Sequence, residues 1–254
     1  MDNREIFAHY TTILDNLIDD YNFFRFYFQS SYSLDEDIVG EYEEGYFREE
    51  NIDIRFGVSR GCIIDHNFPY VVKFDLDEEQ GIYKGTCENE VMIYEAAKLA
   101  GFEKYLCEPI YLGEYVRTFE FYPYNEIIRH IDDFYGFNEN DFTEKLYYAM
   151  DEGLNTKTIT VNIPLYAYPR ARKYFLKFDY SNEAKNEVIQ NGSPLTERSS
   201  AIGCAFIEEY GKMAFKEFSE FLEEYEVNDI HSGNIMSLNG HLIITDFSGY
   251  NEDE

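Results

Sequence analysis

The segment that most constrains this chain is residues 227–249, in which three polar residues surround a short apolar run. Asp229 is followed five residues later by Asn234, and Asp246 comes at the end of the run Leu242–Ile244. A carboxylate, an amide and a second carboxylate in this order are what a phosphoryl-transfer site needs. One group faces the acceptor hydroxyl, and two hold magnesium against the nucleotide phosphates. The segment therefore predicts two functional loops joined by a buried strand.

The length and charge of the chain limit its class and its partners. Its 254 residues suffice for one large domain or two small lobes with a proper core. It has 50 acidic and 21 basic side chains, a formal charge of −29, and such a field repels nucleic-acid phosphates. We therefore do not expect direct binding to nucleic acid. The acidic surface belongs to an ordinary solvated protein or, as an alternative, imitates DNA and occupies a DNA-binding factor.

The cysteines and the hydrophobic runs indicate the compartment. The four cysteines are scattered without a C-x-x-C pair, so they predict neither a zinc ribbon nor a redox motif. Free thiols in a reducing compartment are expected. The N-terminus is not a basic signal region, and no apolar run approaches membrane-spanning length. These features predict a cytoplasmic protein without a membrane partner.

The first half of the chain shows the hydrophobic pattern of a sheet interrupted by a helix. Apolar residues at helical spacing over 4–30 predict one or two amphipathic helices. A helix is also predicted over 87–100, and Gly101 is a natural stop for it. Alternating or continuous apolar runs predict five strands. These are 52–56, 62–64, 70–74, 109–112 and 117–122.

The second half is expected to be mainly helical. Pro123 and Asn125 indicate a link, which divides the chain into domains 1–125 and 126–254. A long helix at about 196–226 is expected to lead to the polar segment described above. The remaining expected elements are helices at about 126–134 and 141–151, a strand at 157–165 and a partner strand at 174–178.

The polar segment resembles that of the protein-kinase-like superfamily, particularly the compact, divergent members that bacteriophages often encode. In that superfamily D-x-x-x-x-N precedes D-F-G. Asp229–Asn234 and Asp246-Phe247-Ser248 match, with serine in place of glycine. The resemblance covers most of the chain in order but is sharp only at 227–249. It implies an α+β, bilobal fold with a five-stranded antiparallel small lobe and a reduced, mainly helical large lobe truncated after the D-F-G-like motif.

The resemblance assigns roles to individual residues and implies ATP and Mg²⁺ as cofactors. Asp229 is the expected catalytic base, and Asn234 and Asp246 are the expected magnesium ligands. Lys73, inside the apolar strand Tyr-Val-Val-Lys-Phe, is expected to contact the α- and β-phosphates. His231 is expected to pack against or polarise the loop rather than to act as the base. The alternative expectation is purely structural: Asp229 caps a turn, and Lys73 faces water from an edge strand.

The resemblance also implies an acidic partner for Lys73 on the following helix. Glu90, seventeen residues further on, is the preferred candidate and completes the expected catalytic set. Glu88 and Glu95 compete with it. Glu95 is neither three nor four residues from Glu90, so the two side chains should point in different directions.

A phosphate-covering loop is expected at Gly57-Val-Ser-Arg-Gly61, ahead of the lysine-bearing strand. The full G-x-G-x-x-G pattern is absent. Glycines and a serine still bring backbone N–H groups close to phosphate, and an arginine adds charge. Read alone, the segment is an ordinary hairpin turn. The candidate nucleotide-binding residues here are Gly57, Ser59, Arg60 and Gly61.

The chain departs from the kinase pattern in two further ways. Val227 and Asn228 replace His-Arg, which puts the usual regulatory contacts in doubt. The chain stops eight residues after Asp246, which leaves no room for an activation loop and further helices. A substrate platform is therefore expected from 126–226, from a partner subunit, or not at all. The local candidates for binding an acidic substrate or phosphate, if they are not simply a solvated basic loop, are Arg170, Arg172 and Lys173.

The resemblance thus implies a kinase that transfers the γ-phosphate of ATP to a hydroxyl, with protein Ser or Thr as the first expected acceptor. Residues 229–234 resemble the loop of aminoglycoside and choline kinases at least as closely, so a small-molecule hydroxyl is an alternative. A pseudokinase or an acidic DNA-mimic-like protein that inhibits a host factor is another. The expected partners are ATP and a protein substrate or host protein, in the host cytoplasm if the chain is phage-encoded.

Overall fold

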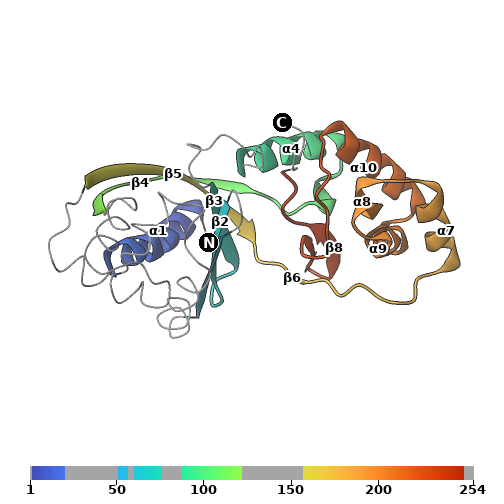
Figure 1. The fold of residues 1–254 in the computed structure, drawn as a ribbon, viewed down its shortest axis with the longest axis horizontal. Helices are drawn as coiled ribbons and strands as arrows, with labels where there is room; N and C mark the ends of the chain where they lie inside the picture. The colour runs from blue at the N-terminus through green and yellow to red at the C-terminus, as the bar shows by residue number, and fades with distance from the viewer. Residues whose placement is uncertain (1, 21–50, 57–59, 76–86, 122–156, 249–254) are drawn as a thin grey trace, which may run out of the picture. The chain divides into compact units, whose positions relative to one another are not determined.

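The structure is a computed structural model that describes residues 2–20, 51–56, 60–75, 87–121 and 157–248 (Figure 1). It contains α-helices, a five-stranded antiparallel sheet and a three-stranded sheet. The expected α+β class with a five-stranded antiparallel sheet is therefore confirmed, and the bilobal kinase-like arrangement stays a prediction. The expected helices at 126–134 and 141–151 and the link at Pro123 and Asn125 lie outside the described residues.

The chain divides into two compact units, each assembled from separate segments. The first consists of Met1–Asn67, Phe74–Glu79 and Leu112–Leu165. The second consists of Phe68–Lys73, Gln80–Tyr111 and Tyr166–Glu254. The division passes through three strands of the large sheet, so each of these strands contributes residues to both units.

The large sheet has the strand order β1-β2-β3-β5-β4. The predicted first three strands are confirmed, and β1 pairs with β2 so that Ile54 lies opposite Ile63. β3 pairs antiparallel with β5, which places Val71 opposite Tyr168 and Lys73 opposite Tyr166. The strands are β1 (Ile52–Phe56), β2 (Arg60–Asp65), β3 (Tyr70–Asp75), β4 (Ile110–Phe121) and β5 (Lys157–Pro169).

Two expectations about this sheet were wrong. The predicted strands 109–112 and 117–122 form the single strand β4, because alternation continues through the middle, with Tyr115 and Phe119 buried between exposed neighbours. The fifth strand is β5, which extends the predicted strand 157–165 to Pro169 and joins this sheet. Its pairing is non-local, so local hydrophobic pattern alone does not reveal it.

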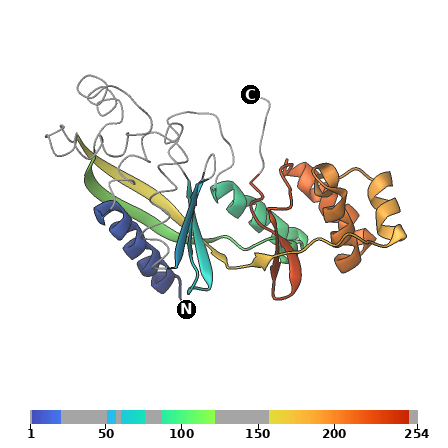
Figure 2. The ribbon, with the colours of Figure 1, turned by 60° about the horizontal axis from the view of Figure 1, so that its bottom comes forward.

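Helix α1 (Asn3–Asp20) packs within the first unit (Figure 2). Ile6, Tyr10, Ile13 and Leu14 are buried at helical spacing, which confirms the predicted helix over the described part of 4–30. Polar contacts add to the packing: the His9 ring lies 2.9 Å from Asp65 of β2.

Helix α4 (Cys87–Ala100) follows the predicted bounds. It ends at Gly101, whose φ of 81° suits glycine, and the short helix η1 (Glu103–Tyr105) follows. Its buried side includes Cys87, Ile93 and Ala97, and it also includes the carboxylate of Glu90 in the first turn. The buried side of the helix therefore carries one acidic residue, Glu90.

The predicted long helix at 196–226 was wrong, because the segment contains three helices. These are α8 (Pro194–Glu197), α9 (Ser200–Tyr210) and α10 (Lys212–Glu224), preceded by α7 (Asn182–Gln190). Ser193 caps α8, and Gly211, with a φ of 90°, cannot continue α9 as a helix. Phe206, Phe215 and Phe218 fill the core of this bundle.

The predicted partner strand at 174–178 was also wrong. Instead, β6 (Arg172–Lys173) pairs with β7 (Ile235–Leu238), which pairs with β8 (His241–Ile244). Tyr174 and Leu176 pack on the core while Phe175 is exposed. The segment thus has the alternation of a strand but forms no strand, since alternation reports burial and not hydrogen bonding.

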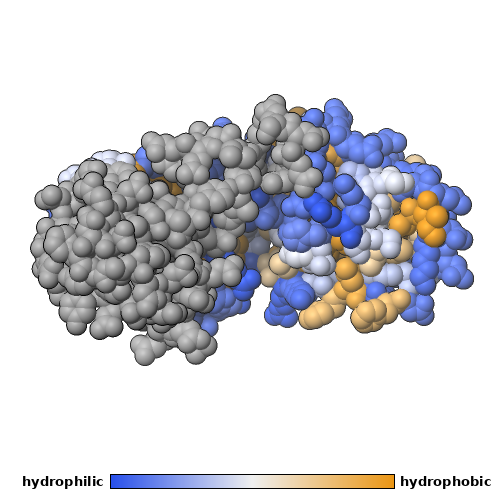
Figure 3. All heavy atoms as spheres, viewed as in Figure 1, coloured by the Kyte–Doolittle hydropathy of each residue, from blue (hydrophilic) through white to orange (hydrophobic). Residues whose placement is uncertain are grey.

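Polar residues (blue) cover much of the described surface seen in Figure 3, with smaller apolar areas (orange) between them. Within the described ranges, no helix is long and apolar enough to cross a membrane.

Ion pairs between α7 and α10 make the stability of the helical bundle pH-dependent. Lys216 and Lys212 lie 3.0 and 3.4 Å from the Glu187 carboxylate. Hydrogen bonding to Lys216, with Lys212 adding to it, holds the pKa of Glu187 below its usual value near 4.5. The contribution to stability is therefore present above that value and is lost as the pH falls below it. Glu187→Gln should lower stability at neutral pH and flatten its acid dependence in urea unfolding, whereas the exposed control Glu217→Gln should change neither.

Candidate functional site

The structure brings Lys73, Glu90 and Asp246 together within the second compact unit. The Lys73 Nζ atom lies 3.3 and 3.4 Å from the two Glu90 oxygens and 3.7 Å from Asp246 Oδ1. The lysine comes from β3, the glutamate from the first turn of α4 and the aspartate from the loop after β8. A strand, a helix and a late loop therefore meet at one ammonium group.

The Glu90 carboxylate is fully buried and is held by donors from three segments. Besides Lys73, the hydroxyl of Tyr168 on β5 donates to Oε2, and the Phe247 backbone N–H donates to Oε1 at 3.0 Å. A buried charge is stable only when it is paired and hydrogen-bonded. Glu90 therefore links β3, β5 and the loop that carries Asp246.

The competing glutamates do not share this position. Glu88 is exposed, and Glu95 is exposed and lies 3.2 Å from Lys98 on the same helix. The geometry therefore places Glu90 alone of the three beside Lys73.

Asn234 joins the loop of Asp229 to that of Asp246. Its side-chain nitrogen donates to the carbonyl oxygens of Asp229 and Asp246, at 2.9 and 3.3 Å. The backbone carbonyl oxygen of Asn234 accepts a hydrogen bond from the Thr245 N–H at 2.8 Å. One largely buried amide thus fixes the backbone at both predicted acidic positions.

Asp246 has an unusual backbone conformation. Its φ is 61°, in the left-handed region that costs a non-glycine residue about 1–3 kcal/mol. Phe247 and Ser248 are buried, while the Asp246 side chain is 43 % exposed. Hydrogen bonds from Asn234 and to Glu90 hold the turn on its two sides. The strained turn therefore separates a buried phenylalanine from an accessible carboxylate.

The donor set fits magnesium. The Asn234 amide nitrogen donates to two carbonyl oxygens, so the oxygen of the same amide is the Asn234 atom that would bind the ion, together with the Asp246 carboxylate. Magnesium prefers oxygen and usually takes one or two protein groups together with phosphate and water. Within the described ranges, no group of three or more His, Cys, Asp or Glu side chains is placed so that it could hold a metal ion.

Asp229 is half-exposed and has a cationic neighbour that the sequence analysis missed. Arg198, between α8 and α9, places Nη2 3.5 Å from Asp229 Oδ1. Of the three cations expected near a substrate, Arg172 and Lys173 lie on β6 and Arg170 precedes it, and all three are exposed. The sequence does not indicate this contact, because the approach of Arg198 to Asp229 depends on how α8 packs beside the loop.

His231 shapes the same loop. Its Nδ1 accepts the Gly233 N–H at 3.0 Å. A Cβ atom at position 233 would lie 2.7 Å from the imidazole, so the glycine is needed for this approach. The contact agrees with a loop-shaping role for His231.

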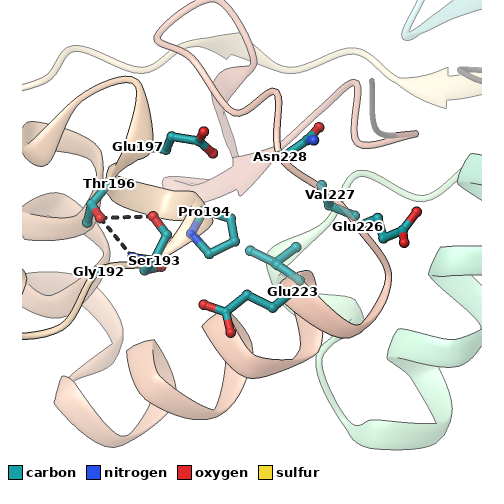
Figure 4. Close-up of a pocket in the computed structure, with 10 residues that line it drawn as sticks. Gly192, Ser193, Pro194, Thr196, Glu197, Glu223, Glu226, Val227 and Asn228 are labelled. Carbon is teal, nitrogen blue, oxygen red and sulfur yellow. Dashed lines mark hydrogen bonds between the residues drawn. The ribbon is translucent and has the colours of Figure 1, made fainter. Parts of the chain in front are cut away.

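A cavity of about 610 Å³ opens beside the Asp229 loop (Figure 4). Its wall includes Glu197 and Asn228, the chain neighbours of Arg198 and Asp229. Figure 4 shows that these walls come from α8 and from the loop that follows α10. The lining residues are Gly192, Ser193, Pro194, Thr196, Glu197, Leu222, Glu223, Glu226, Val227 and Asn228.

The expected phosphate-covering loop is described only in part. Gly57 and Ser59 lie outside the described residues. Arg60 begins β2, and a Cβ atom on Gly61 would lie 2.3 Å from the Phe74 ring. Close packing against Phe74 is therefore sufficient to require glycine at position 61, whatever its relation to phosphate.

The interior next to Lys73 is largely apolar. Burial raises the pKa of the Cys107 thiol to about 12, although the nearby Lys73 charge opposes the shift. Cys107 packs with Cys87, Tyr166, Tyr168 and Ile243. Charges interact more strongly in such an environment than in water. The attraction between Lys73 and Glu90 is therefore stronger than that of an exposed pair.

The arrangement was compared with known proteins. Neither models of protein families, nor curated proteins, nor solved structures gave a match.

Proposed function

We propose that the protein is a magnesium-dependent phosphotransferase that moves the γ-phosphate of ATP to a hydroxyl group. The observation that carries the proposal is the convergence of Lys73, Glu90 and Asp246, with nitrogen–oxygen distances of 3.3–3.7 Å. Kinase-type phosphoryl transfer uses a strand lysine paired with a helix glutamate, and an aspartate that holds the metal. All three occur here in the corresponding order along the chain.

Lys73 and the two metal ligands are proposed to bind the nucleotide phosphates. Glu90 holds the Lys73 ammonium in place, and the ammonium neutralises charge on the α- and β-phosphates. Asn234 and Asp246 would hold magnesium, which when bound neutralises charge that develops on the phosphate oxygens. The apolar interior around Cys107 strengthens the electrostatic field at Lys73.

Asp229 serves the acceptor. Its half-exposed carboxylate can orient an acceptor hydroxyl and take its proton as the oxygen attacks phosphorus. The Asn234 hydrogen bond to the Asp229 backbone carbonyl holds the backbone that carries this carboxylate. Alignment of acceptor and phosphate is the main contribution that such a site makes.

A protein Ser or Thr is the first proposed acceptor, because Asp229 is accessible from solvent. A small-molecule hydroxyl is the second, and the cavity beside Asp229 supports it. A volume of about 610 Å³ is in the range of small-ligand sites. Its wall carries Glu197, Glu223 and Glu226, for which no ion pair is found within the described ranges, so this acceptor would be cationic.

The function is tested by transfer from γ-labelled ATP to protein extracts and to amino-sugar or amino-alcohol acceptors, with magnesium present. Asp229→Asn should lower the rate about 10²- to 10⁴-fold, because the base is lost while nucleotide binding remains. Asp179→Asn is the control, since Asp179 is fully exposed and pairs only weakly with Lys185. Equal rates for Asp229→Asn and the wild type, or nucleotide binding without any transfer, would contradict the proposal.

A further inference from the structure

Tyr168 contacts both members of the Lys73–Glu90 pair. Its hydroxyl donates to Glu90 Oε2, and its ring centroid lies 4.6 Å from Lys73 Nζ. The side chain is almost fully buried, with 2 % exposed. One residue thus touches the carboxylate with its polar end and the ammonium with its aromatic face.

The register between β3 and β5 explains this double contact. Tyr166 lies opposite Lys73, and Tyr168 lies opposite Val71. Residues two apart on a strand share a face, so Lys73 and Tyr168 are diagonal neighbours on one face of the sheet. Long and aromatic side chains reach each other across such a diagonal.

The two contacts have different physical effects. A hydrogen bond to a buried carboxylate holds its orientation, because the group cannot exchange that bond for water. A ring face attracts an ammonium group, more strongly where water is excluded. Together they restrict where Glu90 and Lys73 can meet.

We propose that Tyr168 is a positioning residue of the nucleotide site. Its hydroxyl orients Glu90, and its ring fixes the height of the Lys73 ammonium above the sheet. Lys73 is thereby presented to the phosphates in one position before nucleotide binds. The effect of Tyr168 on nucleotide binding rests on the proposed function. Its positioning of Glu90 and Lys73 does not require catalysis.

The first test compares Tyr168→Phe with Tyr210→Phe by magnesium–ATP titration and by urea unfolding. Both changes remove a hydroxyl that donates a hydrogen bond within the same unit, since the Tyr210 hydroxyl donates to the Leu242 carbonyl at 2.5 Å. Tyr168→Phe should weaken ATP binding about tenfold, the effect of losing one bond to a charged group. Tyr210→Phe should leave ATP binding unchanged. Equal ATP affinities in both variants would overturn the proposal.

The second test needs no nucleotide. Acylation of Lys73 by acetic anhydride is followed by mass spectrometry, with Lys98 as the internal reference because its side chain is 53 % exposed. Relative to Lys98, Lys73 should react several-fold faster in Tyr168→Phe and faster again in Tyr168→Leu, which also lacks the ring. Unchanged Lys73 reactivity would overturn the positioning role. Failure of the wild type to bind ATP would instead count against the proposed function.

Discussion

Asp246→Asn is expected to lower phosphoryl transfer about 10³-fold or more, because a neutral amide replaces the charged ligand for magnesium. The fold should be unaffected. Asparagine tolerates the left-handed conformation better than most residues, and Asp246 has a φ of 61°. The Asp246 contact made by Asn234 is to the backbone carbonyl, so the substitution leaves it in place. Transfer rates measured over a range of magnesium concentrations, with Asp179→Asn as the control, test this expectation.

The same experiment separates a metal role from a structural one. If Asp246 binds magnesium, higher magnesium should partly restore the rate in Asp246→Asn, while urea unfolding should show little change. A variant that transfers phosphate within about threefold of the wild type at low magnesium would exclude Asp246 as an essential ligand. A large fall in unfolding free energy would show that its carboxylate is mainly structural.

Glu90→Gln is expected to destabilise the protein by about 3 kcal/mol, in the range for breaking a buried ion pair. The amide keeps the shape of the side chain but leaves Lys73, whose side chain is only 12 % exposed, without its closest carboxylate. It also weakens the bonds donated by Tyr168 and by the Phe247 N–H. Asp246, 3.7 Å from Lys73, offsets part of the loss. Urea unfolding at neutral pH measures the change.

Glu95→Gln is the matched control. It makes the same chemical change on the same helix, but Glu95 and Lys98 are both more than half exposed. An exposed pair of this kind contributes about 0.5 kcal/mol or less. If the two variants lose equal stability, the central position assigned to Glu90 is wrong.

The local part of the site could be predicted from sequence. A lysine inside the apolar run of β3 and an acidic residue in the first turn of α4 are both visible in the hydrophobic pattern. The helix period also distinguishes Glu90 from Glu95, because only Glu90 falls on the buried side. The Asp229, Asn234 and Asp246 spacing likewise identifies two loops around a short strand.

The non-local part could not be predicted. Tyr168 reaches Glu90 because β5 joins the large sheet beside β3, and nothing in the segment 157–169 specifies that partner. Arg198 reaches Asp229 through the packing of short helices that the sequence suggested were one. In both cases the local pattern shows which residues are buried but not which distant residues they meet.

The central claim is that Lys73, Asn234 and Asp246 form a site for a nucleoside triphosphate with magnesium. Calorimetric titration of the wild-type protein with ATP, with and without magnesium, tests it most directly. The account predicts saturable binding at one site that is markedly tighter when magnesium is present. Absence of binding up to millimolar ATP with magnesium, or affinity that does not depend on the metal, would contradict it.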